Sequence, residues 1–306
     1  MMKYEPSQIH AAPVAEGARF EIGSATAFAV RQENKDIALR IRRQDRPMRA
    51  WVERTPFLRG MARLLRCVFG WADGALESAE LEPQRIVKGS RFEQRFATLF
   101  RVHPTSLVAF GSAILVILLL VGALWAAPWA LAEFVLDGLP CGQITAACCA
   151  ARLLGALLAV ALIPRLRVLN RFCMYRGAIN QVLNAYESLG GAVSRESAEE
   201  APPFTGRSDT AFTALVLLVS IVVFALVRTH TLWARLAVRA LIILALAAIL
   251  DEPVRLLEAM PADHRLRWLH APLRFLEKLV VLRPHRQMIE VALYAFNAAR
   301  ENDDAA

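Results

Sequence analysis

The residues best suited to chemistry lie in a polar stretch, residues 170–212, between two pairs of apolar segments. On a helix, Arg176, Asn180 and Glu187 would fall at i, i+4 and i+11 and share one face, with Asn184 beside them. Such a face has the composition to bind an anion. It also suits a helix that hydrogen-bonds to a neighbouring domain, and the sequence leaves both interpretations open.

Two carboxylates in or beside this stretch are candidate catalytic groups. Glu187 and Asp209 could act as general acid and base if they share a desolvated pocket, and Arg207 could hold an anionic substrate. Candidate ligand-binding residues are Tyr175, Arg176, Asn180 and Thr210.

Metal-site spacings are missing from the sequence. No two of the six histidines stand at i, i+4, where both imidazoles could grip one ion from a helix. The five cysteines include no CxxC pair, so neither a zinc site nor a disulfide framework is indicated. We therefore predict no metal and no cofactor.

The elements that must position the polar stretch begin with a cytoplasmic α+β region, residues 1–103. Residues 1–20 are expected to be irregular because they contain two prolines. Residues 25–30 and 37–41 have the composition of short strands around a polar turn, which predicts a small β-hairpin.

Two amphipathic helices are expected to follow the hairpin. One begins at Thr55 and Pro56, a capping hydroxyl followed by a proline at the first helical position. The other follows Ser90. In the first, Leu58, Met61, Leu65, Val68 and Ala72 recur at helical spacing, and Arg59, Arg63 and Arg66 fall largely elsewhere. Such a helix could lie on the inner leaflet with its arginines among phosphates, or it could pack on a neighbouring domain.

Four apolar segments predict a mainly α-helical polytopic membrane protein with about four transmembrane helices. The segments at 106–125 and 144–163 are each long enough to cross about 30 Å of hydrocarbon. The pair at 210–227 and 236–250 is shorter and suggests a tilted hairpin that crosses incompletely. The predicted division is a first transmembrane hairpin at 104–163, a cytoplasmic polar island at 164–209, a second hairpin at 210–250 and a cytoplasmic helical tail at 251–306.

Charge sets the expected orientation and partners. The chain has a net charge of +8, and residues 128–142 contain no Lys or Arg, whereas the regions before the first span and after the second are basic. Basic flanks favour the cytoplasm, which predicts that both termini are cytoplasmic. The expected partners are the lipid bilayer and its anionic headgroups. Nucleic acid is not expected, because aromatic residues do not interleave the basic cluster at 40–49.

Ordered fragments along the chain resemble the YqhQ-like family of bacterial membrane proteins, a family of unknown function often described as predicted metal-dependent enzymes. The resemblance implies a location in the bacterial inner membrane. The matching fragments include Glu16-Gly17, Pro56-Phe57-Leu58-Arg59-Gly60, Arg171-Phe172, Gly177-Ala178, Ala185-Tyr186-Glu187 and Met288-Ile289-Glu290-Val291-Ala292-Leu293.

The family motif Tyr-His-Gly-Ala-Glu-His-Lys has the His-x-x-Glu-His form of a metallopeptidase signature. In this chain its histidine, glutamate and histidine positions are Arg176, Ile179 and Asn180. Downstream, the family's His-Pro-Arg-Cys-Gly-Thr becomes a stretch in which Thr205 and Ser208 replace the histidine and cysteine. The resemblance thus implies a divalent metal whose ligands this chain has lost.

Three functions remain open at this stage. The first is a non-catalytic scaffold or regulatory partner of other membrane proteins or of an intact relative. The second is a membrane-bound hydrolase-type enzyme that uses Glu187, Asp209 and Arg207 or an unrecognised metal site. The third is transport of a small solute past Arg152, the one ionisable residue in the first two spans.

Overall fold

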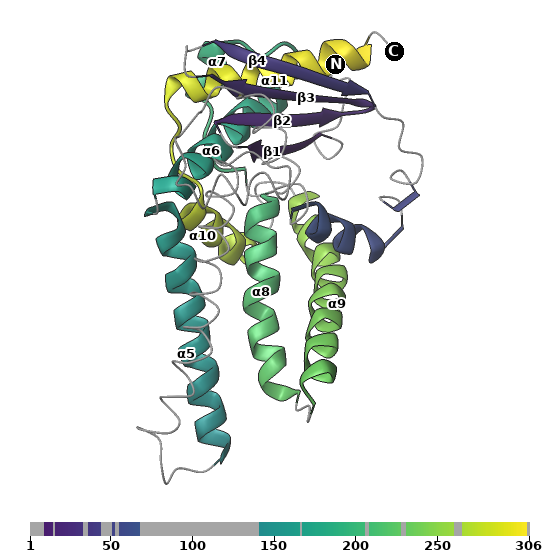
Figure 1. The fold of residues 1–306 in the computed structure, drawn as a ribbon, viewed down its shortest axis with the longest axis vertical. Coiled ribbons are helices and arrows are strands. Elements are labelled where there is room, and N and C mark those ends of the chain that lie inside the picture. The colour runs from purple at the N-terminus through teal and green to yellow at the C-terminus, as the bar shows by residue number, and fades with distance from the viewer. Residues whose placement is uncertain are drawn as a thin grey trace, which may run out of the picture.

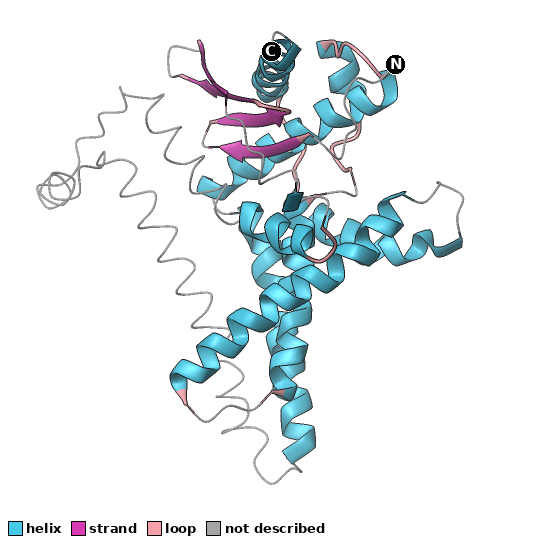
Figure 2. Cartoon of the chain, turned by 90° about the vertical axis from the view of Figure 1, so that its right-hand side faces the viewer, coloured by secondary structure: helices cyan, strands magenta, loops and turns pink. Residues whose placement is uncertain are grey.

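A computed structural model describes residues 9–14, 16–32, 36–43, 51–52, 55–67, 141–165, 167–205, 208–227, 231–259 and 265–304. Its elements form two parts, a sheet packed with helices and a set of long helices beneath it (Figure 1, Figure 2). They are β1 (His10–Val14), β2 (Gly17–Ile22), β3 (Ala25–Arg31), β4 (Ile37–Arg43), α5 (Cys141–Leu162), η2 (Ile163–Arg165), α6 (Arg167–Leu189), α7 (Arg195–Glu200), α8 (Asp209–Leu226), α9 (Leu232–Ala259), η3 (Arg265–His270), α10 (Ala271–Val280) and α11 (Arg286–Asp304).

The sheet is an antiparallel meander in the order β1-β2-β3-β4. The predicted hairpin corresponds to β3 and β4, but the prediction that residues 1–20 are irregular is wrong from His10 onward. The prediction took Pro13 as a sign of irregular structure, but a proline is tolerated on an edge strand such as β1. Gly17 favours close pairing of β2 with β3, since a Cβ there would lie 2.1 Å from the Ala29 carbonyl oxygen.

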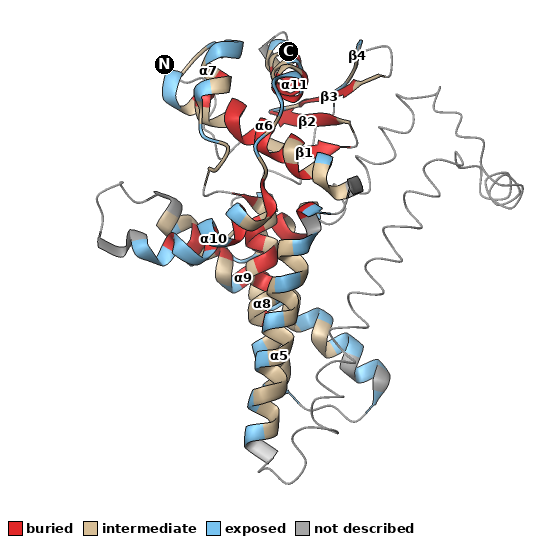
Figure 3. Ribbon diagram, turned by 90° about the vertical axis from the view of Figure 1, so that its left-hand side faces the viewer, coloured by how far each residue is buried: buried red, intermediate tan, exposed pale blue. Residues whose placement is uncertain are grey.

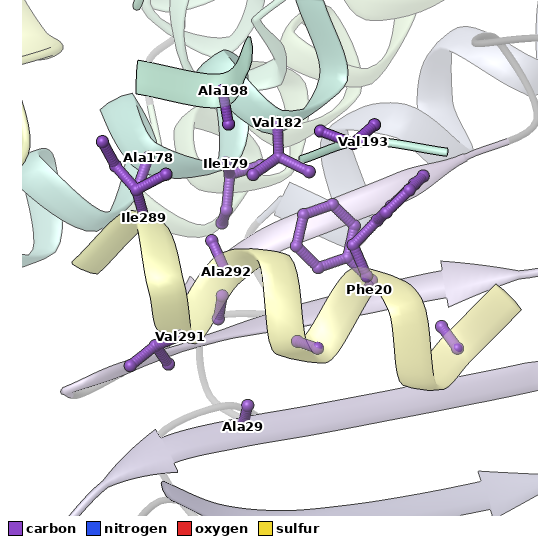
Figure 4. Close-up of a cluster of buried hydrophobic side chains, with 14 of the residues drawn as sticks. Phe20, Ala29, Ala178, Ile179, Val182, Val193, Ala198, Ile289, Val291 and Ala292 are labelled. Carbon is purple, nitrogen blue, oxygen red and sulfur yellow. The ribbon is translucent and has the colours of Figure 1, made fainter. Parts of the chain in front are cut away.

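Helices α6 and α11 cover one face of this sheet (Figure 4). Side chains alternate along β2, so that Phe20 points toward the helices while Arg19 and Glu21 pair on the opposite face. The Phe20 ring contacts the Phe296 ring of α11 edge-on, with 5.5 Å between the ring centres. The Tyr186 ring of α6 also contacts the Phe296 ring edge-on, with 5.3 Å between the centres. The beginning and the end of the chain therefore share one apolar core, which we call the sheet core.

Below the sheet stand α5, α8 and α9, and their side chains are far less buried than those of the sheet core (Figure 3). Among the described residues, two helices are long and apolar enough to cross a membrane, at Gln143–Leu162 and Asp209–Leu226. They match the second and third predicted spans. The prediction of four spans is not confirmed: the segment at 106–125 lies outside the described residues, and the one at 236–250 forms part of the longer α9.

The helix predicted after Thr55 is present over residues 58–67, which we call helix 58–67, and it packs against α8 and α9, the second of the two expected arrangements. It buries Gly60, Arg63 and Leu64, while Leu65 is 43% exposed. Gly60 allows the helix to approach α9, because a Cβ there would lie 2.3 Å from the Ala247 carbonyl oxygen. Arg63 is then close enough to form ion pairs with α8 and α9. The amphipathic helix expected after Ser90 lies outside the described residues.

Candidate functional site

The polar stretch identified in the sequence is built on α6, a helix of the sheet core. An apolar stripe that includes Ala178, Ile179 and Val182 faces the sheet and α11 (Figure 4). Residues three and four apart along a helix are neighbours on its surface. The polar side chains of α6 therefore form a row of their own beside the apolar stripe. The stripe fixes the rotation of α6 and thereby the direction of its polar side chains.

In the N-terminal half of α6, Arg176 and Tyr175 are buried. The guanidinium of Arg176 donates through Nη1 to the carbonyl oxygen of Ala11 in β1, at 2.8 Å. Its Nε is buried and has no hydrogen-bond partner in the described part of the chain. Burial raises the pKa of the Tyr175 hydroxyl above its usual range. Arg176 thus fastens α6 to the edge strand of the sheet.

One turn further along α6, Asn180 contacts a buried carboxylate. Its Nδ2 donates to Glu277 Oε1 of α10 at 3.1 Å and to the carbonyl oxygen of Pro203 at 2.9 Å. The same Glu277 oxygen accepts from Thr205, from its backbone N–H at 3.1 Å and its hydroxyl at 3.2 Å. Glu277 is only 1% exposed, so these donors replace the water that a carboxylate would otherwise require.

Two further amides continue this arrangement along the helix. Gln181 Nε2 donates to the carbonyl oxygen of Ala201 at 2.8 Å, and Asn184 Nδ2 donates to those of Pro202 at 2.6 Å and Phe204 at 3.1 Å. Asn180, Gln181 and Asn184 together hold the segment 201–205, and we call them the amide clamp. Their donors are used by backbone carbonyls within the protein.

Asp209, a candidate catalytic carboxylate, lies at the start of α8 in an ion-pair network. Arg63 donates through Nε to Asp209 Oδ1 at 2.7 Å and through Nη1 to Asp251 Oδ1 at 3.1 Å. Asp251 is fully buried in α9 and also accepts from Arg255 at 2.6 Å. The guanidinium of Arg63 stacks over the Phe212 ring, 4.6 Å from its centre. We call Arg63, Asp209, Asp251 and Arg255 the ion-pair junction.

The remaining candidates occupy separate places. Glu187 is half-buried on α6, eleven residues beyond Arg176, which is about 16 Å along the helix axis. Thr210 is half-buried in the first turn of α8, and Arg207 lies outside the described residues. The structure therefore brings Asn180 together with Thr205 and Glu277, and Asp209 together with Arg63.

Sequence reasoning missed Glu277, Arg63 and Asp251, although a signal was present for two of them. Glu277 stands on the apolar stripe of α10, four residues after the buried Leu273, and Asp251 directly follows a predicted span. A carboxylate in such a place requires partners once it is buried. Arg63 carried no comparable signal, because arginine is common on exposed helix surfaces.

The residues at the positions of the family's metal motif do not fit a metal ion. Arg176 is a permanent cation, and Ile179 is 0% exposed within the sheet core. Asn180 already donates to two oxygens. Within the described ranges, no three His, Cys, Asp or Glu side chains come together as a metal would require.

Comparison with known proteins supports the resemblance seen in the sequence. The chain is 27% identical over 130 residues to "Uncharacterized protein YqhQ" of Bacillus subtilis (strain 168). That alignment covers 42% of this chain and 41% of the relative, so the chain matches less than half of the relative's length. No solved structure matches. The family described as "Protein of unknown function (DUF1385)" matches residues 55–302, and the chain is therefore a member of this YqhQ-like family.

Proposed function

We propose that the protein is an integral protein of the bacterial cytoplasmic membrane that acts as a non-catalytic scaffold or regulatory partner. The amide clamp carries this proposal. The polar residues that replace the family's metal motif donate to backbone carbonyls and to Glu277, and they join the sheet core to the membrane-proximal helices. A side chain used in this way stabilises an architecture and is not presented to a substrate.

Two observations support the location in a membrane. The leucines Leu154 and Leu158 of α5 are exposed although the helix is long and apolar, which is unfavourable in water and favourable in lipid. The arginine-free segment 128–142 precedes the end of α5 that is farthest from the sheet, whereas basic residues lie at its sheet-proximal end (Figure 1). By the positive-inside rule, this distribution favours a cytoplasmic sheet.

The partner class follows from the same reasoning. The chain matches the family over residues 55–302 but has Arg176, Ile179 and Asn180 at the motif positions. Such a chain is suited to associate with an intact relative or with other membrane proteins. In this proposal no metal-dependent step occurs in this chain.

Elemental analysis of the purified full-length protein tests the loss of the metal site. We expect transition metal far below one equivalent, in the wild type as well as in the Asn180→Ala variant. One equivalent of metal that is lost on substitution Glu277→Gln but kept in Glu187→Gln would overturn the proposal, because it would place a working metal site at the clamp.

Complementation tests the non-catalytic role. A deletion strain should be rescued by Glu187→Gln as well as by wild type, since no chemistry depends on this carboxylate. Failure of Glu187→Gln to rescue, with the protein present in the membrane at the wild-type level, would favour the alternative enzyme that uses Glu187, Asp209 and Arg207.

A further inference from the structure

Helix α10 lies across the sheet-proximal ends of the long helices instead of continuing beside them (Figure 3). Its buried residues Leu273 and Leu276 pack in one cluster with Ala211 and Phe212, which belong to the first turn of α8. The candidate span of α8 begins at Asp209. The helix is therefore level with the end of that span, where the hydrocarbon of a bilayer would give way to headgroups.

On its opposite side, α10 exposes a large apolar residue, and so does η3, the helical turn that precedes it. Phe275 is 55% exposed, and Trp268 of η3 is 68% exposed. On the helix, the exposed Pro272 adjoins Phe275, because positions three apart are neighbours, whereas Leu279 is half-buried against the cluster. Trp and Phe at the end of a span are typical of the interface between hydrocarbon and headgroups.

Basic residues border this apolar surface. Arg274 and Lys278 are exposed, one helical turn apart, on the other side of Phe275. Arg165, at the end of η2, is exposed as well, and η2 contacts α10. This combination of aromatic residues and cations complements anionic lipid at a membrane surface, where phosphates lie beside the ends of the acyl chains.

We propose that α10 is an interfacial helix that binds the cytoplasmic leaflet: Trp268 and Phe275 enter the boundary of the hydrocarbon, and Arg165, Arg274 and Lys278 contact anionic headgroups. This inference rests on the proposed membrane location. It adds a specific lipid surface, and it gives the sheet core a fixed height and orientation above the bilayer, because Glu277 of the same helix is hydrogen-bonded to α6.

Site-directed spin labelling of the full-length protein in lipid vesicles tests this surface. Single labels are placed by Leu217→Cys in α8, Phe275→Cys in α10 and Tyr294→Cys in α11, after replacement of the five native cysteines. All three native side chains are large and substantially exposed, so the sites are matched. Collision with oxygen reports lipid, and collision with a water-soluble nickel chelate reports water. Each label is measured in phosphatidylcholine and in a three-to-one mixture of phosphatidylcholine and phosphatidylglycerol.

We expect position 217 to favour oxygen, position 294 to favour nickel and position 275 to be intermediate, with less nickel contact in the anionic mixture. Arg274→Gln with Lys278→Gln should reduce the difference between the two lipid compositions at position 275 to less than half, with Arg165 as the remaining cation. Persistence of more than half of that difference in the double variant would refute the role of these two cations.

The outcomes separate this inference from the proposed function. Water-like behaviour at position 275 with lipid-like behaviour at position 217 would overturn the interfacial helix and leave the membrane location standing. Water-like behaviour at position 217 would overturn both. Dipolar broadening between labels at position 275 would show that a second copy of the chain covers α10, which would also overturn the lipid assignment.

Discussion

The sheet core and the ion-pair junction are both buried, but they are held together by opposite chemistry. In the sheet core, Phe20, Ile179 and Phe296 pack through apolar surface, with no side-chain hydrogen bond required of them. In the ion-pair junction, Asp251 is equally buried and is surrounded by the guanidinium groups of Arg63 and Arg255. The sheet core is stabilised by apolar contacts that exclude charged groups, whereas the junction pairs its carboxylates with guanidinium groups.

This difference assigns the two regions different roles. Apolar packing tolerates changes of similar volume, so the core secures the fold without demanding particular residues. A buried ion pair adds little net stability but is costly when one partner is lost, so the junction fixes how helix 58–67 meets α8 and α9. Substitutions in the two regions should therefore differ in their effect on stability.

Ile179→Glu should be the most damaging substitution. The position is 0% exposed among apolar side chains, so a carboxylate there would be desolvated without a partner, at a cost of about 4 kcal/mol or more. Ile179→Val, which keeps the position apolar, should cost about 1 kcal/mol. Chemical denaturation of the purified protein in mild detergent measures both. Equal stability of the two variants would contradict the placement of Ile179 in the sheet core.

Arg63→Met should rank second. It preserves apolar volume but leaves Asp209 without the cation at 2.7 Å and removes one of the three arginines that pair with buried Asp251, at a cost of about 3 kcal/mol. The comparison variant is Arg59→Met: the pair of Arg59 with Glu252 is partly exposed, and Arg59 lies 3.9 Å from Asp251, at the edge of the junction, so its loss should cost only about 1 kcal/mol. A larger loss of unfolding free energy for Arg59→Met than for Arg63→Met would contradict the division.

Asn180→Ala tests the amide clamp and should cause an intermediate loss of unfolding free energy. The variant loses a donor to the buried carboxylate of Glu277 and should cost about 2 kcal/mol. Asn184→Ala removes an amide that binds only neutral carbonyls, one of them at an exposed contact, and should cost less than about 1 kcal/mol. The same denaturation assay compares them, and the reverse order would show that Glu277 does not depend on the clamp.

Ionisation of the Cys173 thiol should not change the free energy of unfolding at neutral pH, but it should lower it measurably in alkali. Burial raises the pKa of its thiol from 9.0 to about 12, so the folded protein keeps a proton that the unfolded chain releases. The associated stability is fully present below pH 9 and is lost as the pH rises toward 12. The wild type should therefore lose more stability than Cys173→Ala over this range. Rapid alkylation of native Cys173 by iodoacetamide at mildly alkaline pH would contradict its burial.

Local features of the chain could be predicted from its sequence, and contacts between distant segments could not. Helices α5 and α8 match two segments that were predicted from apolar length alone, and α10 and α11 lie in the helical tail predicted at 251–306. The ion pairs of Arg63 were not anticipated, because its partners lie 146 and 188 residues away. Glu277 was missed for the same reason, since Asn180 is 97 residues distant. Asp209 was recognised as important, yet its observed partner, Arg63, was not anticipated.

The shared core of the first strands and the last helix has a consequence for synthesis. Ser24, in the turn between β2 and β3, hydrogen-bonds to Asp303 at the end of α11, 279 residues later in the chain. At roughly 5–20 residues per second, a ribosome needs roughly fifteen seconds to a minute to make the residues between them. Throughout that interval the apolar face of β2 lacks the cover that α11 provides. The nascent chain must therefore protect unfinished strands, by itself or with a chaperone, until α11 closes the fold.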